Sequence, residues 1–353
     1  MEIAYVGPLP PLTGGISQHG ARLTDALAAL GHSVSRLSWS AQYPKLFYKG
    51  PVRDESAGQH PDATFDLRWW DPTSWRRAGK IAGRSQLLVF PWVTPVVAPA
   101  YRVLLGAAAP VPAVAVVHNL LPHERRPGDA ALARWVLSRV RGVLLHAAAD
   151  RPTLTAWGIT TDRVAHPPNL PMQRAPQPPA PPHMLLFFGH VRPYKGLDIA
   201  IEAVRVLRAK NVPVRLTIAG HVWGSIDDWK RQIAAAGIED AVSFRPAYVP
   251  DEEVAELFAS HHLVLAPYRT ATQSGIVPLA RESGRPVVAT MVGGLGEGFR
   301  VGVDGELASR PDPIEFAAAI ERALRMSPDP GSDDSENVAT WADVAAKVVE
   351  LGR

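Results

Sequence analysis

Apolar residues follow two kinds of pattern along the chain. Short continuous apolar runs end at glycine, proline or charged residues, while longer segments repeat an apolar residue every three or four positions. The runs are typical of strands buried on both faces of a sheet, and the repeats are typical of amphipathic helices. The predicted strands are 3–6, 33–37, 114–117, 184–188, 214–219, 242–244, 263–266 and 286–290. The predicted helices are 16–30, 197–207, 251–260, 275–284, 313–326 and 341–351.

The two halves of the chain begin alike. Strand 3–6 runs into a loop that closes at Gly14-Gly15 before a helix. Strand 184–188 is followed by Gly189 and by a loop that closes at Lys195-Gly196, again before a helix. This alternation predicts an α/β fold with two Rossmann-like, doubly wound parallel sheets. Open sheets of this kind bind ligands where their strands end, so we expect the two carboxyl edges to face each other across a cleft.

Proline separates the two halves. Eight of the sixteen residues from 167 to 182 are proline, which is incompatible with a helix or a central strand and typical of a semi-rigid linker. The predicted organisation is a first domain, a proline-rich linker, a second domain and a helical segment that completes the first domain. Their bounds are 1–170, 171–182, 183–335 and 336–353.

Composition narrows the class of protein. Cysteine is absent, which excludes thiol catalysis, cysteine-ligated zinc and disulfides, and the 46% of hydrophobic residues is ordinary for a globular chain. No basic, apolar leader precedes the first strand. The most apolar segment, 87–117, is interrupted by prolines and an arginine, so we expect no membrane span. These features predict a cytoplasmic protein.

Charge is distributed unevenly. Residues 1–182 hold 19 Lys/Arg and 11 Asp/Glu, a net charge of +8, and residues 183–353 hold 18 and 23, a net charge of −5. The asymmetry suggests two domains with different partners. A basic first half would attract an anionic acceptor, or place the protein at the anionic inner face of a membrane. A scattered, solvated surface charge is the alternative, and nothing in the sequence points to nucleic-acid binding.

A dinucleotide-dependent dehydrogenase is the first function that the motifs exclude. Its G-x-G-x-x-G fingerprint should follow a first strand directly. The first loop, 7–15, is instead long and rich in proline, and the loop 189–196 carries cations where glycines are needed. A phosphate-binding G-x-x-x-x-G-K-[ST] loop is also absent from the sequence.

Two loops of the second half carry candidate phosphate-binding residues. Arg192 and Lys195 lie between the end of a strand and the start of a helix, where two cations and the helix dipole favour a diphosphate. An exposed basic loop is the alternative. The segment 267–276 has the same strand-to-helix position, and its small Ser274 and Gly275 would let a second phosphate approach.

With these pieces in order, the chain resembles the retaining glycosyltransferase family 4, glycosyl transferases group 1, of bacterial type. The resemblance covers nearly the whole chain and implies the GT-B fold. Its motifs are Gly14-Gly15-Ile16, His118-Asn119, Phe187-Phe188-Gly189 with Lys195-Gly196, Pro267-Tyr268, Gln273-Ser274-Gly275, 284–290 and Gly293-Gly294.

The family implies a nucleotide-sugar donor bound mainly by the second domain and an acceptor bound mainly by the first. The implied catalytic residues are His118, Arg192 and Lys195. His118 would orient the sugar or stabilise an oxocarbenium-like charge through its backbone carbonyl. The alternative interpretation of His118 is a purely structural histidine. The implied phosphate-binding residues are Gly14, Gly15, Gly189, Thr272, Gln273, Ser274, Gly275 and Ile276. Further donor contacts are expected from Asn119, His190 and Glu297, although Glu297 also suits a plain surface role.

Two departures from the family pattern bear on the donor. The family's arginine follows the loop glycine directly, whereas His190 stands there and the arginine is Arg192. The family's E-x₇-E motif is absent: its glutamates align with Thr272 and Ala280, and Glu282 lies two residues beyond on a different helix face. The resemblance therefore does not define the donor or the residues that recognise its ribose.

The combined expectation is a retaining, metal-independent hexosyltransferase-type enzyme (class EC 2.4). It would move a sugar from a UDP- or GDP-sugar to a sugar, lipid-linked or small-molecule hydroxyl, in the biosynthesis of glycans, glycolipids or glycosides. No cofactor or metal is expected, because no D-x-D triplet occurs to hold a divalent ion on the diphosphate. The alternatives are a GT-B sugar-nucleotide epimerase and a non-catalytic accessory subunit that binds nucleotide-sugars.

Overall fold

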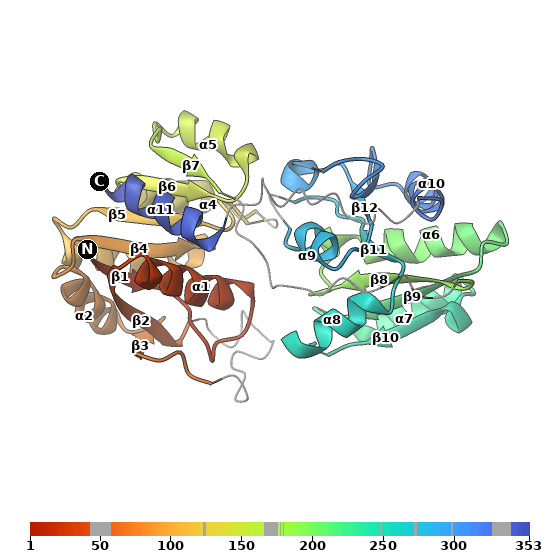
Figure 1. Ribbon diagram of the computed structural model, residues 1–353, viewed down its shortest axis with the longest axis horizontal. Helices are drawn as coiled ribbons and strands as arrows, with labels where there is room; N and C mark the ends of the chain where they lie inside the picture. Colours follow the sequence, from red (N-terminus) through yellow and green to blue (C-terminus); the bar gives the residue numbers. More distant parts are fainter. Residues whose placement is uncertain are drawn as a thin grey trace. The chain divides into compact units, whose positions relative to one another are not determined.

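The computed structural model describes residues 1–42, 58–122, 125–165, 176, 178, 180–247, 249–271, 274–297, 299–326 and 340–353. The chain forms two compact units (Figure 1). Unit 1 comprises Met1–Pro168 and Asn337–Arg353, and unit 2 comprises Asn169–Glu336. The chain therefore leaves unit 1, builds the whole of unit 2, and returns.

Unit 1 is built on a parallel sheet with the strand order β3-β2-β1-β4-β5-β6-β7. The order reverses between β1 and β4, which defines the topological switch point at which sheets of this kind bind ligands. The strands are β1 (Glu2–Val6), β2 (Ser33–Ala41), β3 (Ala63–Arg68), β4 (Leu87–Trp92), β5 (Ala113–Val117), β6 (Gly142–Leu145) and β7 (Asp162–Val164).

Helices cover both faces of this sheet, and each face has its own apolar cluster. One cluster includes residues of α2 and α3, and the other includes residues of α1 and α11. The return segment thus supplies a covering helix, because Val344, Ala345 and Val348 of α11 are fully buried against the sheet. The helices are α1 (Gly15–Ala29), α2 (Pro72–Ala82), α3 (Ala98–Ala108), α4 (Asp129–Leu137), α5 (Arg151–Ala156) and α11 (Trp341–Gly352).

Unit 2 repeats the plan with the parallel strand order β10-β9-β8-β11-β12-β13, which reverses between β8 and β11. Its strands are β8 (His183–Phe188), β9 (Val214–Ala219), β10 (Val242–Arg245), β11 (Leu263–Ala266), β12 (Val287–Thr290) and β13 (Gly305–Ala308). Its helices are α6 (Leu197–Ala209), α7 (Ile226–Ala235), α8 (Asp251–Ala259), α9 (Ile276–Glu282) and α10 (Pro313–Ala323). The prediction of two doubly wound parallel sheets is confirmed.

The apolar segment 87–117 is not one element but four: β4, a short 3₁₀ helix at Pro95–Val97, α3 and β5. Its prolines fall at the ends of these elements and within β4. One continuous helix cannot run through the segment, because proline inside a helix breaks it. Across the described residues, no helix combines the length and the apolar character that a bilayer crossing needs.

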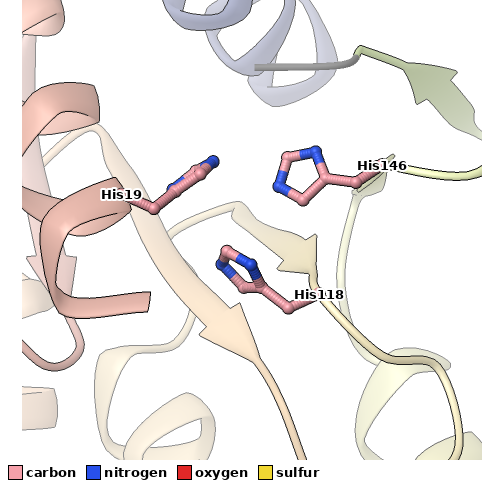
Figure 2. Close-up of side chains that lie close together, drawn as sticks. All are labelled: His19, His118 and His146. Atoms are coloured by element: carbon pink, nitrogen blue, oxygen red, sulfur yellow. The ribbon is translucent and has the colours of Figure 1, made fainter. Parts of the chain in front are cut away.

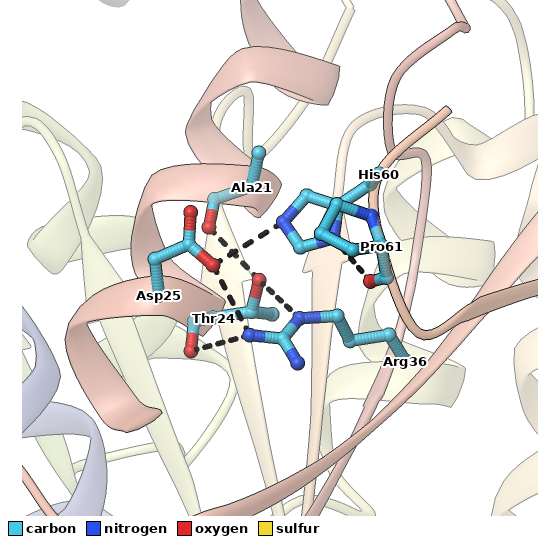
Figure 3. A network of polar contacts seen from close by, with 6 residues as sticks. All are labelled: Ala21, Thr24, Asp25, Arg36, His60 and Pro61. Atoms are coloured by element: carbon cyan, nitrogen blue, oxygen red, sulfur yellow. Dashed lines mark hydrogen bonds and ion pairs between the residues drawn. The ribbon is translucent and has the colours of Figure 1, made fainter. Parts of the chain in front are cut away.

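A buried polar network ties α1 to β2 and to the segment before β3 (Figure 3). The Arg36 guanidinium donates from Nε to Thr24 Oγ1 at 3.1 Å and from Nη2 to Asp25 Oδ1 at 3.1 Å. His60 Nε2 lies 3.2 Å from the same Asp25 oxygen. Arg36 and Thr24 are buried while Asp25 is exposed, so the network leads a buried guanidinium out to a solvated carboxylate.

Replacing Thr24 by valine should destabilise unit 1 by about 1–3 kcal/mol, because Arg36 Nε then loses its acceptor while remaining buried. Thr155→Val is the matched control. Thr155 makes the same kind of bond to its own helix, Oγ1 to Arg151 O at 3.0 Å, without accepting from a guanidinium. Urea unfolding of both variants measures the difference, and equal midpoints would show that the Thr24–Arg36 bond contributes nothing.

Candidate functional site

The candidate donor site of unit 2 lies at the carboxyl edge of its sheet, at the switch point. The loop after β8 contains Arg192 and Lys195, and the loop after β11 contains Ser274 and Gly275. Because β8 and β11 are neighbours, these two loops emerge side by side. The sequence could place each loop after a strand, but only the strand order shows that the two strands are adjacent.

The two cations of the β8 loop rest on aromatic rings. Arg192 Cζ lies 4.2 Å from the centre of the Trp223 ring, and Lys195 Nζ lies 5.3 Å from the centre of the Tyr268 ring. Among the described residues, neither side chain has a carboxylate partner. Positive charge is thus positioned by packing and is not neutralised by an ion pair there, which is the arrangement that an anionic ligand requires.

The β8 loop is fixed to the β11 loop by close backbone contacts. Gly196 has φ +68°, and a Cβ at this position would lie 2.0 Å from the carbonyl oxygen of Pro267. Arg269 N donates to Tyr194 O at 2.7 Å, and the Arg269 guanidinium pairs with Asp198 on α6 at 2.5 Å. Only glycine permits this approach, so Gly196 sets the position of the neighbouring Lys195.

His190 stands next to these cations but is not itself one. Burial, followed by the charges of Lys195, Arg192 and His221, lowers its pKa to about 4. A histidine with this pKa is neutral near pH 7. His190 therefore cannot supply the charge of the family arginine whose sequence position it occupies. Lys195 Nζ also lies against Gly189, 3.0 Å from where a Cβ would stand.

Three of the predicted phosphate-binding residues, Ser274, Gly275 and Ile276, lie at the start of α9. Ser274 Oγ donates to the Tyr268 hydroxyl at 3.2 Å and accepts from Ile276 N at 3.3 Å, so Ser274, Gly275 and Ile276 form a closed turn at the start of α9. The helix has only seven residues, so its dipole is a minor part of any phosphate site. Thr272 and Gln273 lie outside the described residues.

The structure also describes Ala280, which aligns with the family's second glutamate, and Glu282, which lies two residues beyond it. Ala280 is fully buried in the apolar cluster of unit 2, where no ligand reaches it. Glu282, at the end of α9, lies on another helix face. Glu297 directly follows the short turn Gly293–Gly296, and the backbone of that turn contacts the β11 loop: Gly294 N donates to Ala271 O at 3.3 Å. Glu297 is thus in the adjoining loop, after β12.

In unit 1 the candidate residues occupy the corresponding edge. Gly14, with φ +104°, precedes α1, and Gly15 is its first residue. Among the described residues, no atom beyond the chain neighbours lies within 4 Å of a Cβ built at either glycine, so the described structure leaves space beside this turn. Asn119 follows His118 after β5. The open space fits a ligand that approaches the backbone of the Gly14-Gly15 turn.

His118 lies within a group of three histidines (Figure 2). His19 comes from α1, His118 follows β5 and His146 follows β6, and their rings point toward one another. The ring centres are 4.6 Å apart for His19 and His118, 4.8 Å for His19 and His146, and 5.0 Å for His118 and His146. Trp341 of α11 packs edge-on against His19 at 4.8 Å.

The electrostatics of this cluster favour neutral rings. Burial, followed by the neighbouring imidazoles and Arg22, holds the pKa of His19 well below its ordinary value. Burial, followed by His146, does the same for the pKa of His118. The Nε2 atoms of His19 and His118 are buried and have no hydrogen-bond partner in the described structure.

His19 and His146 were not anticipated as site residues from the sequence. A signal for His146 does exist: it directly follows a buried strand, as His118 does, and β5 and β6 are neighbours with Val117 opposite Leu145. His19 lies one helical turn after Gly15, on the face of α1 that packs against the sheet. Neither signal identifies a site residue from the sequence alone, because each depends on knowing which strands are neighbours in the sheet.

Comparison with solved structures identifies the fold. The two units share the GT-B fold with solved structures that match along nearly the whole chain. These include the Anabaena protein HepE in complex with UDP (18% identity, TM-score 0.64, covering 100% of this chain and 97% of that one). They also include the sucrose-phosphate synthase of Thermosynechococcus elongatus (17%, TM-score 0.69, 100% and 94%).

The family comparison concerns unit 2. Residues 182–326 match the model of the family described as glycosyl transferases group 1. Curated relatives include two D-inositol 3-phosphate glycosyltransferases. The one from Thermobispora bispora is 27% identical over 230 residues, covering 59% of this chain and 51% of the relative. The one from Mycobacterium marinum is 36% identical over 148 residues, covering 41% and 31%. The chain thus spans about half, or less, of the length of these relatives.

Proposed function

We propose that the protein is a retaining glycosyltransferase that transfers a hexose from a UDP-sugar or GDP-sugar to an acceptor hydroxyl. The observation that carries the proposal is the pair Arg192 and Lys195, positioned by aromatic rings at the switch point of unit 2 and without a carboxylate partner among the described residues. Two such cations complement a nucleoside diphosphate, which carries its negative charge on two adjacent phosphates.

The chemistry follows from charge. As the glycosidic bond to the diphosphate breaks, negative charge grows on the leaving phosphate, and Arg192 and Lys195 stabilise it. The acceptor hydroxyl attacks from the face on which the diphosphate leaves, and its proton passes to the departing phosphate oxygen. This front-face course retains the anomeric configuration. In unit 1, the Gly14-Gly15 turn and the carbonyl of His118 are the proposed contacts to the reacting sugar.

Among donors, a UDP-sugar has the most support, since structural relatives have been solved with UDP and with UDP-glucose. The acceptor is proposed to be anionic, because the first half of the sequence has a net charge of +8. The names of the curated relatives, D-inositol 3-phosphate glycosyltransferases, agree with a phosphorylated acceptor.

The test is a panel of UDP- and GDP-sugars incubated with the purified full-length chain. We expect slow hydrolysis of one donor and faster release of its nucleotide when the acceptor is present. The Lys195→Met variant should lose this release, whereas Lys230→Met, which removes an exposed cation of α7, should retain it. Return of an isomerised donor would identify an epimerase instead, and binding without any turnover would identify an accessory subunit.

A further inference from the structure

We propose that His19, His118 and His146 of unit 1 form a binding site for a divalent transition-metal ion of the Zn²⁺ type. The three imidazoles bring one nitrogen each to within 4.8 Å of the other two. They come from three separate elements, α1 and the ends of β5 and β6, and they converge inside unit 1 (Figure 2). Nothing in the proposed glycosyl transfer uses the side-chain nitrogens of this group.

The first argument is the burial of nitrogens that have no partner. His19 is 8% exposed, and its Nε2 is buried without a hydrogen bond in the described structure. The Nε2 of His118 is also buried without a hydrogen bond in the described structure, although the residue as a whole is only partly buried. Buried polar atoms normally have a partner, because leaving one unsatisfied costs free energy. A metal ion placed among the rings would satisfy both nitrogens at once.

The second argument is the hydrogen bond that orients His146. Its Nδ1 lies 2.8 Å from the carbonyl oxygen of Ala165. A carbonyl only accepts, so Nδ1 carries the proton and Nε2 carries the lone pair. Metal-binding histidines have this arrangement as a rule: one nitrogen donates to a backbone carbonyl or carboxylate, and the other faces the ion.

The third argument concerns size and selectivity. Bonds of about 2.0–2.1 Å to Zn²⁺ in a tetrahedral arrangement separate the nitrogens by about 3.4 Å, so small rotations draw the rings inward. The group contains no carboxylate among the described residues, which disfavours Mg²⁺ and Ca²⁺ and favours Zn²⁺, Co²⁺ or Ni²⁺. Three protein ligands leave a fourth position for water. An ion here would link α1 to the ends of β5 and β6.

The proposed metal ligands are side chains of unit 1, whereas Arg192 and Lys195, which carry the proposed diphosphate contacts, belong to unit 2. Metal-independent catalysis is expected because the sequence has no D-x-D triplet that would hold a metal ion on the diphosphate. A metal ion bound by histidines of unit 1 does not contradict that expectation. It also leaves the backbone carbonyl of His118 available for the sugar.

The experiment uses the full-length chain, stripped with EDTA and exchanged into metal-free buffer. Titration with Co²⁺ should produce the visible absorption bands of a tetrahedral cobalt site, with saturation at one ion per chain. Zn²⁺ at about 100 times its dissociation constant should raise the Tm of unit 1 by about 5–10 °C, whereas Mg²⁺ should leave it unchanged.

His19→Gln and His146→Gln should each weaken Co²⁺ binding by about 100-fold or more, since the loss of an outer partner alone weakens metal sites by about 10–100-fold. His32→Gln is the matched control, because His32 lies beyond the other end of α1 and contacts the amino terminus at 3.1 Å. The metal-free Tm shows whether each variant folds. The proposal is overturned if the wild-type chain gives neither the cobalt bands nor a zinc-dependent Tm, or if both glutamine variants bind Co²⁺ like the wild type.

Discussion

Replacing Arg192 or Lys195 by methionine should weaken the binding of UDP by about 10–100-fold. Each side chain holds a phosphate in the proposed site, and a hydrogen bond to a charged group contributes about 1.5–3 kcal/mol. Methionine keeps an apolar stem of similar length and removes the charged group together with its contact on the Trp223 or Tyr268 ring. Uridine, which has no phosphate, should bind the variants and the wild type alike. Calorimetric titration with UDP and with uridine, in EDTA, measures both ligands.

His190→Asn provides the contrast. Because burial lowers the pKa of His190 to about 4, the ring is neutral in the folded protein from about pH 5 upward, and its replacement should change UDP binding less than about threefold at pH 7.5. The same low pKa means that His190 adds no pH dependence to binding between pH 6 and 8. A severe His190→Asn effect with a mild Arg192→Met effect would reverse the assignment of the phosphate ligand.

Gly196→Ala should destabilise unit 2 by about 2–5 kcal/mol and abolish UDP binding at ordinary concentrations. The left-handed backbone costs an alanine about 1–2 kcal/mol. The added methyl group would also stand 2.0 Å from the Pro267 carbonyl oxygen, which forces the backbone apart at a further cost of about 1–3 kcal/mol. Separation of the β8 and β11 loops moves Lys195, and the binding of diphosphate depends on its position.

Gly237→Ala is the matched control for this prediction. Gly237 also lies in unit 2 and has φ +63°, close to the +68° of Gly196, but no atom of the described residues lies within 4 Å of its Cβ position. Its replacement should therefore cost only the backbone strain and leave UDP binding intact. Urea unfolding and UDP titration of both variants separate strain from contact. Equal losses in the two variants would show that the contact with Pro267 has no role.

The sequence predicted the architecture because its signals were local and repeated. The runs that became β1, β8, β11 and β12 are apolar on both faces and end at turn residues, so their pattern needs no tertiary context. Among the strands it missed, β4 and β6 carry the same buried apolar signal, whereas β3 and β7 do not. β3 alternates exposed and buried residues at one edge of its sheet, and β7 is only three residues long. Strands of this kind are stabilised by their neighbours more than by their own composition.

The candidate site was predictable only in part. Lys195 and His118 lie in local motifs and could be named directly. The neutrality of His190 could not be predicted, because it results from burial beside Lys195 and Arg192, which depends on packing. The partners of His118 were equally hidden: His19 and His146 are 99 and 28 residues away in sequence, and only the parallel pairing of β5 with β6 brings His146 beside it.

The return of the chain to unit 1 sets an order of assembly during synthesis. The ribosome must complete all of unit 2 before α11 emerges, yet Val344 and Val348 of α11 fill the core of unit 1 and Trp341 covers His19. Until then, one face of the first sheet has an uncovered apolar strip along β4, β5 and β6. The nascent first unit is thus a natural client for a chaperone that holds apolar surface, although its own strands were translated first.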